Sequence, residues 1–422
     1  MPPAAEQRPR QEGEDDQEEE GAWVDGELLR QVLDGGTLVH LDVQRAVGKG
    51  ENYLSVLYRA RVEYHPAGSE ETQVKHLIVK GLPAGEFMAT FVEEIGCFRR
   101  EADIYDEVLP RLYAFADERL GGKSFKRFSA LSHKTSRPDT LVLDDLRPEG
   151  FVMAPRRDRL DFAHSKLVVQ TLARLHVLSL SYCEEHPGYI SQFDDRMYSE
   201  HNRERLQQFI PPQIKSIAEE IREWKGFAEI ADKLEALIPK SIDKLIETCK
   251  HVQGGRTVLV HGDSWVNNIL FKYSDSGEPI DLRFVDYQLT REASPGQDLN
   301  YFLFSSPRSD IRERHFDDLL HEYCDEFKRC AKDLRYSGPL ITFDEIRKDI
   351  NRTLYFGFIS VLTTMAVVLV DPEDSPDLSK FTEEQVQKGE GMNIFEKVYK
   401  SKNFQEAFQN LLPFFDEQGV FE

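Results

Sequence analysis

Cysteine is scarce in this 422-residue sequence, which holds five scattered thiols and no Cys-x-x-Cys pair. A disulfide framework needs paired cysteines and a zinc ribbon needs closely spaced ones, so we exclude both. Isolated thiols are typical of a reducing compartment. Residues 1–16 also lack the apolar run of a signal peptide. These two absences predict a cytoplasmic protein.

Basic residues are also few, with 53 Lys and Arg against 75 Asp and Glu, a formal net charge of −22. Only −6 of this charge lies in residues 1–20, so the body of the chain is acidic as well. Contacts to nucleic-acid phosphates require an excess of Lys and Arg. We therefore expect no nucleic-acid partner, and nothing in the sequence implies a protein partner.

Long apolar runs are missing except for Thr353–Val370, eighteen residues without a charge. This length approaches that of a membrane span. Four Ser or Thr residues and a glycine dilute the run, and the capping-box pattern Thr342–Glu345 begins a helix with charged positions upstream. We therefore interpret the run as part of one long buried helix, Asp344–Val370, and predict no membrane span.

The pattern of the chain changes near residue 150. Residues 1–22 are acidic and are expected to be disordered. Residues 23–147 contain four predicted strands and one helix, and residues 148–422 are mostly helical. The fold class is therefore predicted as α+β, with a small antiparallel-sheet lobe and a large helical lobe. The predicted strands are 38–47, 53–64, 76–81, 141–146, 257–260, 269–272 and 282–285; the predicted helices are 87–112 (stopped near Pro110), 160–180, 194–209, 211–251, 295–304, 315–334 and 344–370.

The strongest chemical signal lies in the segment 260–288. Asp263 precedes Asn268 by five residues, and an apolar strand follows the asparagine. A second short strand ends at Asp286. Phosphoryl transfer needs a carboxylate beside the attacking hydroxyl, and an amide and a second carboxylate to hold Mg²⁺ on the phosphates of ATP. Asp263 is thus the predicted catalytic base, and Asn268 and Asp286 are the predicted metal ligands; the alternative is a strand–turn–strand in which Asp and Asn form turns.

Complementary parts occur upstream of this segment. Lys80 ends a predicted strand and is a candidate for a phosphate contact, and Glu101 on the next helix is a candidate partner for it. The glycine turn with Gly50 and Asn52 is a candidate for backbone contacts to phosphate. Each residue alone also fits a plainer role: a lysine or glutamate in solvent, or a hairpin turn.

Three further residues have predicted supporting roles. Asp144, at the end of the fourth strand, lies where the backbone is expected to pair with adenine. Asp298 falls in the first turn of a helix, where it is expected to support the catalytic loop rather than to act in catalysis. His261 is expected to hold the same loop through hydrogen bonds.

Taken together, these motifs resemble the ecdysteroid-kinase-like family, also described as CHK-kinase-like, which is related to aminoglycoside phosphotransferases and choline kinases. The resemblance covers about residues 35–370. Its most specific elements are the HGDxWxNN and VDYQ motifs. The segments that carry it are GENYLS (50–55), IVKGLP (78–83), FRREADIYDEVLP (98–110), LVLDDLRPEGF (141–151), LARLH (172–176), HGDSWVNNILFKY (261–273) and VDYQLTREASPGQDLNYFLF (285–304).

The resemblance implies a two-lobed, protein-kinase-like fold and an ATP-dependent kinase that requires Mg²⁺. It implies that Asp263 is catalytic, that Asn268 and Asp286 bind the metal, and that Lys80 and Glu101 anchor the phosphates. The acceptor it implies is an alcohol on a small lipophilic molecule such as an ecdysteroid. Asp144 stands where the family often has glutamate.

Three alternatives stay open. The acidic chain is compatible with a cationic acceptor, as in a choline- or aminoglycoside-type kinase. A nucleotide-binding pseudokinase scaffold is a second alternative, against which the complete set of predicted catalytic residues argues. A protein kinase is disfavoured because no activation-loop segment follows Asp286. Aromatic residues that either line a substrate pocket or belong to the core are Tyr198, Trp224, Tyr355 and Phe358.

Overall fold

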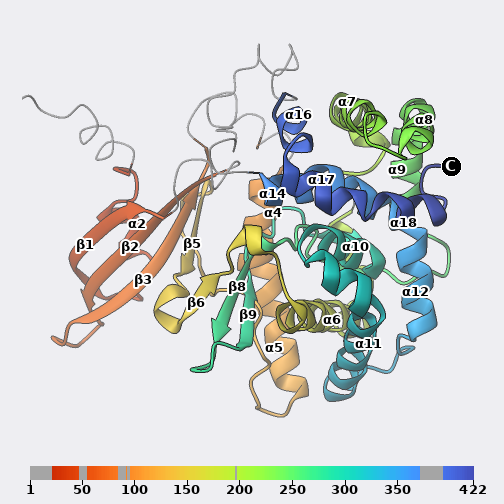
Figure 1. Cartoon of the computed structure of the whole chain (residues 1–422). Coiled ribbons are helices and arrows are strands. Elements are labelled where there is room, and N and C mark those ends of the chain that lie inside the picture. The colour runs from red at the N-terminus through yellow and green to blue at the C-terminus, as the bar shows by residue number, and fades with distance from the viewer. Residues whose placement is uncertain (1–20, 47–54, 84–91, 93–95, 195–196, 371–392) are drawn as a thin grey trace, which may run out of the picture. The chain divides into compact units, whose positions relative to one another are not determined.

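A computed structural model describes residues 21–46, 55–83, 92, 96–194, 197–370 and 393–422. The chain forms two compact units (Figure 1). Unit 1 consists of residues 1–89 and 131–145, and unit 2 of residues 90–130 and 146–422. Residues 1–20 of the predicted disordered tail lie outside the described residues, and residues 21 and 22 form a turn. The assignment of nucleotide binding to residues 23–147, and of the catalytic loop, metal site and substrate pocket to residues 148–422, stays a prediction.

Unit 1 is built on a five-stranded antiparallel sheet with the order β1-β2-β3-β5-β4. The strands predicted from alternating apolar residues are confirmed, and β4 is an addition. Lys80 lies near the end of β3, paired with Leu57 on one side and Leu141 on the other. The strands are β1 (Thr37–Arg45), β2 (Val56–His65), β3 (Gln73–Gly81), β4 (Ser132–His133) and β5 (Thr140–Asp144).

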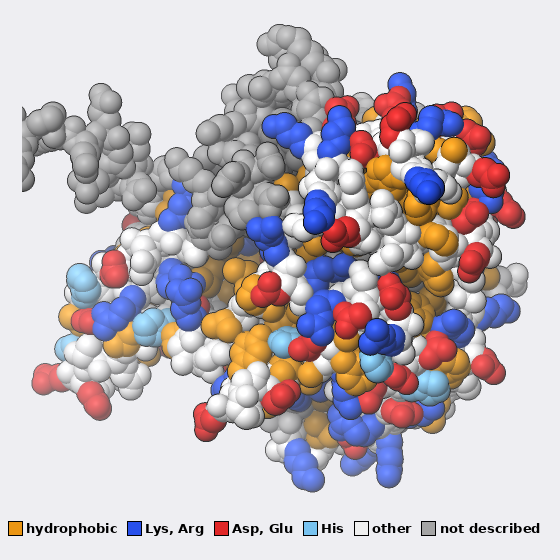
Figure 2. Space-filling view, in the orientation of Figure 1, with side chains coloured by type: hydrophobic (Ala, Val, Ile, Leu, Met, Phe, Trp, Pro, Cys, Tyr) orange, Lys and Arg blue, Asp and Glu red, His pale blue; other side chains and the backbone are white. Residues whose placement is uncertain are grey.

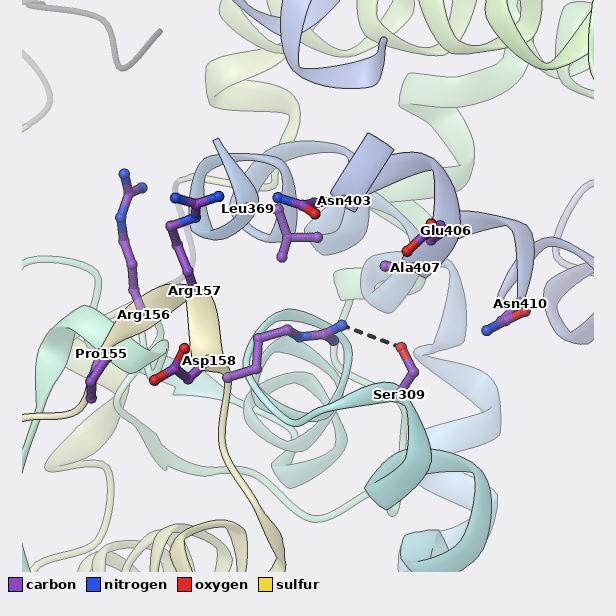
Figure 3. A pocket seen from close by; sticks show the side chains of 11 residues that line it. Pro155, Arg156, Arg157, Asp158, Ser309, Leu369, Asn403, Glu406, Ala407 and Asn410 are labelled. Atoms are coloured by element: carbon purple, nitrogen blue, oxygen red, sulfur yellow. Dashed lines mark hydrogen bonds between the residues drawn. The ribbon is translucent and has the colours of Figure 1, made fainter. Parts of the chain in front are cut away.

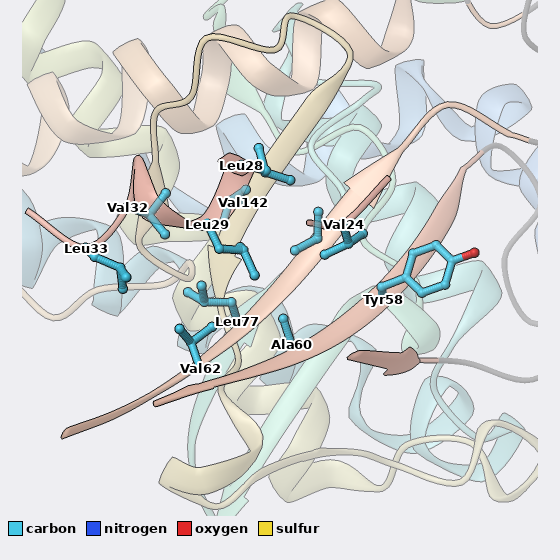
Figure 4. Packing of buried hydrophobic residues seen from close by; sticks show 11 residues of the cluster. Val24, Leu28, Leu29, Val32, Leu33, Tyr58, Ala60, Val62, Leu77 and Val142 are labelled. Carbon is cyan, nitrogen blue, oxygen red and sulfur yellow. The ribbon is translucent and has the colours of Figure 1, made fainter. Parts of the chain in front are cut away.

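One face of this sheet is covered by the short helix α2 (Gly26–Arg30) and the turn that follows it (Figure 4). Asp25 caps the helix by accepting a hydrogen bond from the Leu28 amide at 2.8 Å. The apolar residues of the helix then pack on alternate residues of the strands. The buried cluster comprises Val24, Leu28, Leu29, Val32, Leu33, Tyr58, Ala60, Val62, Leu77, Val79 and Val142.

Unit 2 begins with a helical stretch that the sequence predicts to stop near Pro110. This boundary is wrong, because the chain stays helical through α4 (Cys97–Asp103), a π-helical turn η1 (Ile104–Val108) and α5 (Leu109–Arg119). Pro110 lies in the first turn of α5, where the missing N–H costs no intrahelical bond.

The rest of unit 2 is mainly helical, as predicted. The two long helices α6 and α11 pack along one another (Figure 1). The predicted helix at 194–209 is instead a short 3-10 turn followed by α7, which accommodates Pro211 and Pro212. The helices are α6 (Phe162–Glu185), α7 (Arg203–Arg222), α8 (Ala228–Leu237), α9 (Ser241–Cys249), α10 (Pro295–Ser305), α11 (Ser309–Asp333), α16 (Asn393–Tyr399), α17 (Lys402–Gln409) and α18 (Leu412–Glu417).

Two small antiparallel sheets interrupt these helices. One contains β6 (Phe151–Met153), β8 (Ile269–Tyr273) and β9 (Pro279–Phe284), and the other contains β7 (Val258–Val260) and β10 (Arg291–Ala293). The three strands predicted in this region are confirmed. In the turn between β8 and β9 the Ser274 amide donates to the Glu278 carbonyl.

The apolar run is a broken helix rather than the single long one predicted. Thr342 caps α12 (Phe343–Arg352) as its capping box predicts. The chain then bends by 59° into α13 (Leu354–Ser360), the π-helical turn η8 (Val361–Met365) and α14 (Ala366–Leu369). Within the described part of the chain, no unbroken helix has the length and hydropathy to cross a membrane, although this bent pair passes by length and composition alone.

All five cysteines are free thiols, which confirms the absence of a disulfide framework. The predicted cytoplasmic location stays a prediction.

Candidate active site

The loop after β7 carries the predicted catalytic residue. It runs from His261 to Trp265 and enters β8 through a 3-10 turn, Val266–Asn268. Gly262 has φ +83°, and a Cβ on it would lie 2.1 Å from the Leu289 carbonyl oxygen. Only glycine fits there, because other residues disfavour positive φ and a side chain would collide with the backbone. The loop therefore passes close against the segment that leads into β10.

The carboxylate of Asp263 is held on both oxygens. Asn268 donates its amide Nδ2 to Asp263 Oδ2 at 2.8 Å and to the Asp263 carbonyl at 3.0 Å. The hydroxyl of Tyr301 donates to Oδ1. Asp263 is only 8% exposed, so these bonds fix its orientation in a largely desolvated site.

Asn268 and Asp286 lie at the adjoining ends of two neighbouring strands, Asn268 directly before β8 and Asp286 just after β9. Ile269 pairs with Phe284 in the β8–β9 ladder, and the Val285 amide donates to the Asn268 carbonyl at 3.0 Å. Asp286 has φ +66°, a conformation that residues other than glycine rarely adopt. Such backbone strain clusters at functional sites. The structure thus brings together Asp263, Asn268 and Asp286, as predicted from their spacing.

The donor set fits a magnesium site. Because Nδ2 of Asn268 is used by Asp263, its amide oxygen is the remaining ligating atom, and Asp286 adds a carboxylate. Both are hard oxygen ligands, and Mg²⁺ takes few protein groups and completes its shell with phosphates and water.

Asp298 supports the loop that carries Asp263 through hydrogen bonds to the loop backbone. It lies in the first turn of α10, and its carboxylate accepts the amides of His261 at 2.7 Å and Gly262 at 2.9 Å. His176 of α6 lies 3.1 Å from the same carboxylate and 2.9 Å from the Tyr323 hydroxyl. Burial alone would raise the pKa of Asp298, but the hydrogen bonds and nearby histidines hold it below its usual value. This geometry agrees with the supporting role predicted for Asp298.

His261 has the loop-holding position expected of it. Its Nδ1 accepts the Asp263 amide at 3.2 Å, and its ring packs against Tyr287 and Phe284. Burial lowers the pKa of His261, although Asp298 and Asp286 oppose that shift. The imidazole therefore stays neutral and serves as an acceptor.

Glu101 of α4 is a buried residue of unit 2. It is 2% exposed, which contradicts the plain alternative of a solvent-facing glutamate. Burial raises the pKa of Tyr105, and the charges of Glu101 and Asp286 raise it further, which shows that both carboxylates lie near this tyrosine. Tyr105 also packs edge-to-face on Tyr287 at 5.1 Å.

Lys80 and Asp144 belong to unit 1. Lys80 is only 5% exposed, so the alternative of a lysine in solvent is wrong as well. Its pairing with Glu101 joins two different units and stays a prediction. The amides of Asp144 and Asp145 donate to the carbonyls of Leu131 and His76, so any main-chain donor to adenine has to come from another residue. Gly50 and Asn52 lie outside the described residues.

Tyr301 was not predicted, and it reaches the site through tertiary structure. Thr364 donates to the Tyr301 hydroxyl at 3.0 Å, and Tyr301 donates in turn to Asp263. Thr364 lies in the π-helical turn η8, and π-turns recur at functional sites. Burial raises the pKa of Tyr301 and so does the Asp263 charge, so its hydroxyl stays protonated. In the sequence, the only feature that points to Tyr301 is its position three residues after Asp298.

An arginine and aromatic rings adjoin Tyr301. Arg291 is 1% exposed and donates to the Leu289 carbonyl and to Gln297 Oε1. Its guanidinium lies 5.2 Å from the Tyr198 ring and 5.8 Å from the Phe356 ring, and Phe356 packs at 6.2 Å from Tyr301.

The other aromatic residues proposed for a substrate pocket have different surroundings. Tyr355 and Phe358 are buried, and the Tyr355 hydroxyl donates to the Ser241 carbonyl. Phe358 packs against Phe415, and Trp224 packs against Phe408. Tyr355 and Phe358 are therefore core residues, which was the alternative interpretation.

Comparisons with known proteins give a family and distant likenesses. Among solved structures, an ethanolamine kinase of Plasmodium vivax is similar at 10% identity and TM-score 0.40, covering 85% of this chain and 84% of that one. A glucosamine kinase in complex with glucosamine, ADP and inorganic phosphate is similar at 13% identity and TM-score 0.24, covering 93% and 94%. No curated protein sequence matches significantly.

The profile of the ecdysteroid kinase-like family matches residues 49–336. This region holds every catalytic and metal-binding candidate described above and spans about two thirds of the chain. The resemblance drawn from the motifs is thereby confirmed. The chain belongs to the ecdysteroid kinase-like family, has a kinase-like α+β fold and is a small-molecule kinase.

Proposed function

We propose that this protein is an ATP-dependent O-phosphotransferase that transfers the γ-phosphate to a hydroxyl of a small, lipophilic, ecdysteroid-like alcohol. The observation that carries the proposal is the Asp263 carboxylate, fixed by Asn268 and Tyr301 beside the Asn268–Asp286 pair. A carboxylate beside a hard-oxygen pair is the arrangement that phosphoryl transfer to an alcohol requires.

Asp263 acts as the general base in this proposal. The acceptor oxygen attacks the γ-phosphorus, the bond to the leaving ADP oxygen breaks, and the hydroxyl proton moves to Asp263. Each carboxylate oxygen has two lone pairs, so the bonds from Asn268 and Tyr301 leave room for that proton. Magnesium, held by the amide oxygen of Asn268 and the carboxylate of Asp286, supplies positive charge between the phosphates when bound.

In this proposal the nucleotide is bound mainly by residues of unit 1. Lys80 contacts the α- and β-phosphates and is held by Glu101, while Gly50 and Asn52 approach the phosphates and the backbone near Asp144 adjoins adenine. The burial of Lys80 and of Glu101 supports paired rather than solvated charges, since lone buried charges are costly. The proposed cofactors are therefore ATP and Mg²⁺.

The surroundings of Arg291 favour a neutral acceptor over a cationic one. A quaternary amine is bound by a cage of aromatic rings with a negative environment. Here the faces of Tyr198 and Phe356 are occupied by the protein's own buried guanidinium. A second cation close by would be repelled in this low-dielectric setting. A lipophilic alcohol is thus preferred to choline or an aminoglycoside.

Substitution of the carboxylates tests the assignment of roles. Asp263→Asn and Asp286→Asn are each expected to lower kcat by about 10²–10⁴-fold in an ATP-consumption assay with an accepted alcohol, because the base or a metal ligand is lost. Asp275→Asn is the matched control, since Asp275 is exposed in the β8–β9 turn. Wild-type turnover in Asp263→Asn or Asp286→Asn would refute the roles.

A panel of acceptors tests the substrate class. Steroid alcohols, choline and aminoglycosides are compared with labelled ATP, and product is expected only with neutral lipophilic alcohols. Phosphorylation of choline or an aminoglycoside instead would identify the alternative kinase type. Binding of Mg-ATP without turnover of any alcohol would favour a pseudokinase scaffold.

A further inference from the structure

A cluster of arginines lies on unit 2 away from Asp263. The 3-10 turn η3 (Arg156–Asp158) and the residue after it contribute Arg156, Arg157 and Arg159. Together with the start of α11 and with α17 they line a cavity of about 800 Å³ (Figure 3). Figure 3 shows Arg156 and Arg157 on one wall and Asn403, Glu406 and Asn410 on the opposite one.

The arginines are held in place by the protein. Arg156 donates to the carbonyls of Val367 at 2.5 Å and Val370 at 3.2 Å. Arg159 donates to Ser309 Oγ at 3.3 Å and approaches Met365 Sδ at 3.9 Å. Arg159 also has φ +56°, a backbone conformation that is unfavourable for a side chain of this kind. The guanidinium groups of Arg156 and Arg159 therefore occupy fixed positions, whereas Arg157 is exposed.

A further arginine, Arg312, is buried behind this wall. It follows Ser309 by three residues on α11, so both lie on one face of the helix. Arg312 is 5% exposed, and neither its Nη1 nor its Nη2 has a hydrogen-bond partner within the described chain. The same holds for Nε of Arg159. Burial and the nearby charge of Arg159 together lower the pKa of Arg312 to about 9, although the charge of Glu313 opposes this shift.

Other buried arginines of unit 2 have acceptors. Arg174 pairs with Glu326 at 3.3 Å, and Arg291 bonds to a carbonyl and to Gln297. The carboxylate of Asp310, in the first turn of α11, pairs with Arg308. A buried charge without an acceptor costs several kcal/mol, so Arg312 is expected to have an anionic partner that the described chain does not supply.

We propose that this cavity, termed the arginine cavity and lined by Arg156, Arg157, Arg159 and Ser309 with Arg312 behind them, binds a small phosphate-bearing anion. The guanidinium groups of Arg156, Arg157 and Arg159 and the hydroxyl of Ser309 line the cavity and offer several donors, which suits a tetrahedral oxyanion. The acids Asp158 and Glu406 at the rim limit the net charge and favour a small ligand over a polyanion.

The arginine cavity is distinct from the proposed catalytic site but shares a helix with it. Met365, which Arg159 approaches, follows Thr364 in η8, and Thr364 bonds to Tyr301. An anion in the cavity would therefore brace the helix whose other side orients Asp263.

Thermal unfolding of the full chain with and without inorganic phosphate, at constant ionic strength set with chloride, tests the proposal. Phosphate is expected to raise the Tm of the wild type, and ³¹P line broadening gives its Kd. Arg159→Met is expected to weaken that Kd by about tenfold or more, because a charge-assisted donor that lines the cavity is lost. Arg312→Met is expected to weaken it less, because only a positive charge behind the wall is lost. Arg308→Met, at the exposed residue beside the cavity, is the matched control and retains the wild-type Kd.

A second readout separates ligand binding from a structural role. In phosphate-free buffer Arg312→Met is expected to have a Tm equal to or above that of the wild type, because an unpaired buried charge is replaced by an apolar chain. A lower Tm for Arg312→Met without phosphate would overturn the proposal. So would a wild-type phosphate Kd in both variants, which would place the anion at the nucleotide site.

Discussion

Gly262, in the loop that carries Asp263, is under a tighter steric constraint than Gly277, in the turn between β8 and β9. Gly262 and Gly277 have almost the same φ, +83° and +82°. A Cβ at Gly262 would collide with the Leu289 carbonyl oxygen at 2.1 Å, whereas a Cβ at Gly277 would meet nothing within 4 Å. The two positions therefore separate the cost of conformation from the cost of close approach.

Alanine at these two glycines is expected to act unequally. Gly277→Ala should lower the free energy of unfolding by about 1 kcal/mol, the cost of a left-handed conformation. Gly262→Ala should lower it by about 3 kcal/mol or more and reduce kinase activity, because the backbone around Asp263 must shift. Urea denaturation and the ATP-consumption assay measure both effects. Equal destabilisation by the two variants would show that the contact with Leu289 is unimportant.

Tyr301 marks the limit of residue-level prediction. Asp263, Asn268 and Asp286 were found from spacing, because they flank short strands: Asp263 lies after β7, Asn268 directly before β8 and Asp286 just after β9. Tyr301 is separated from Asp263 by 38 residues and reaches it only because α10 packs beneath the loop. Contacts of this kind depend on helix packing and leave no local pattern in the sequence.

At the scale of elements, the loop at 261–263 depends on α10 and α6. The carboxylate of Asp298 accepts both loop amides and contacts His176 of α6. Since its pKa is held below the usual value, the folded state favours the ionised form. Its contribution to stability is therefore complete above the unfolded pKa of about 4 and is lost as the pH falls through the lower folded pKa.

Asp298→Asn is expected to reveal this contribution. Near pH 7 it should lower the free energy of unfolding by about 3 kcal/mol, because two buried amides lose a charged acceptor. The difference from the wild type should shrink as the pH falls below about 4, because the carboxylate of the unfolded chain is protonated there and the native carboxylate only at a lower pH. Urea denaturation at several pH values measures it, with the exposed Asp275→Asn as control. A difference that is constant down to pH 3 would contradict this assignment.

Element boundaries were predicted less well than element types. Pro110 suggested a helix end, and the uncharged run at 353–370 suggested an unbroken helix. In both places a π-helical turn, η1 or η8, lies inside the helical stretch. Near the start of the run, Asn300 bonds to Thr353 at 2.8 Å and to the Ile350 carbonyl at 2.9 Å, which holds the bend between α12 and α13. These interruptions depend on tertiary contacts and not on local preference.

At the scale of the whole molecule, the charged side chains characterise the surface and the cysteine thiols characterise the interior. On the face seen in Figure 2, Lys and Arg side chains are interspersed with Asp and Glu, so the charge of −22 does not form one acidic patch there. The cysteines are buried except for the half-buried Cys183. Burial raises the pKa of Cys330 to about 12 and that of Cys324 to about 11.

The thiols are therefore expected to be unreactive in the folded protein. With Ellman's reagent at pH 8, at most Cys183 should react within minutes, because thiolate is the reactive form and burial disfavours it. After unfolding in guanidinium chloride, all five thiols should react. Rapid reaction of several thiols in the native protein would indicate that the interior of unit 2 opens readily.

The sequence alone determined the α+β class, the absence of disulfides, the family and the proximity of the candidate site residues Asp263, Asn268 and Asp286, because periodicity, cysteine count and short strand-linked motifs are local properties. Only the tertiary structure decided that Tyr301 and Thr364 orient Asp263, that Arg291 fills the aromatic faces of Tyr198 and Phe356, and that Arg312 is buried without an acceptor. These features arise from the packing of segments far apart in the chain, which brings together side chains whose spacing carries no signal.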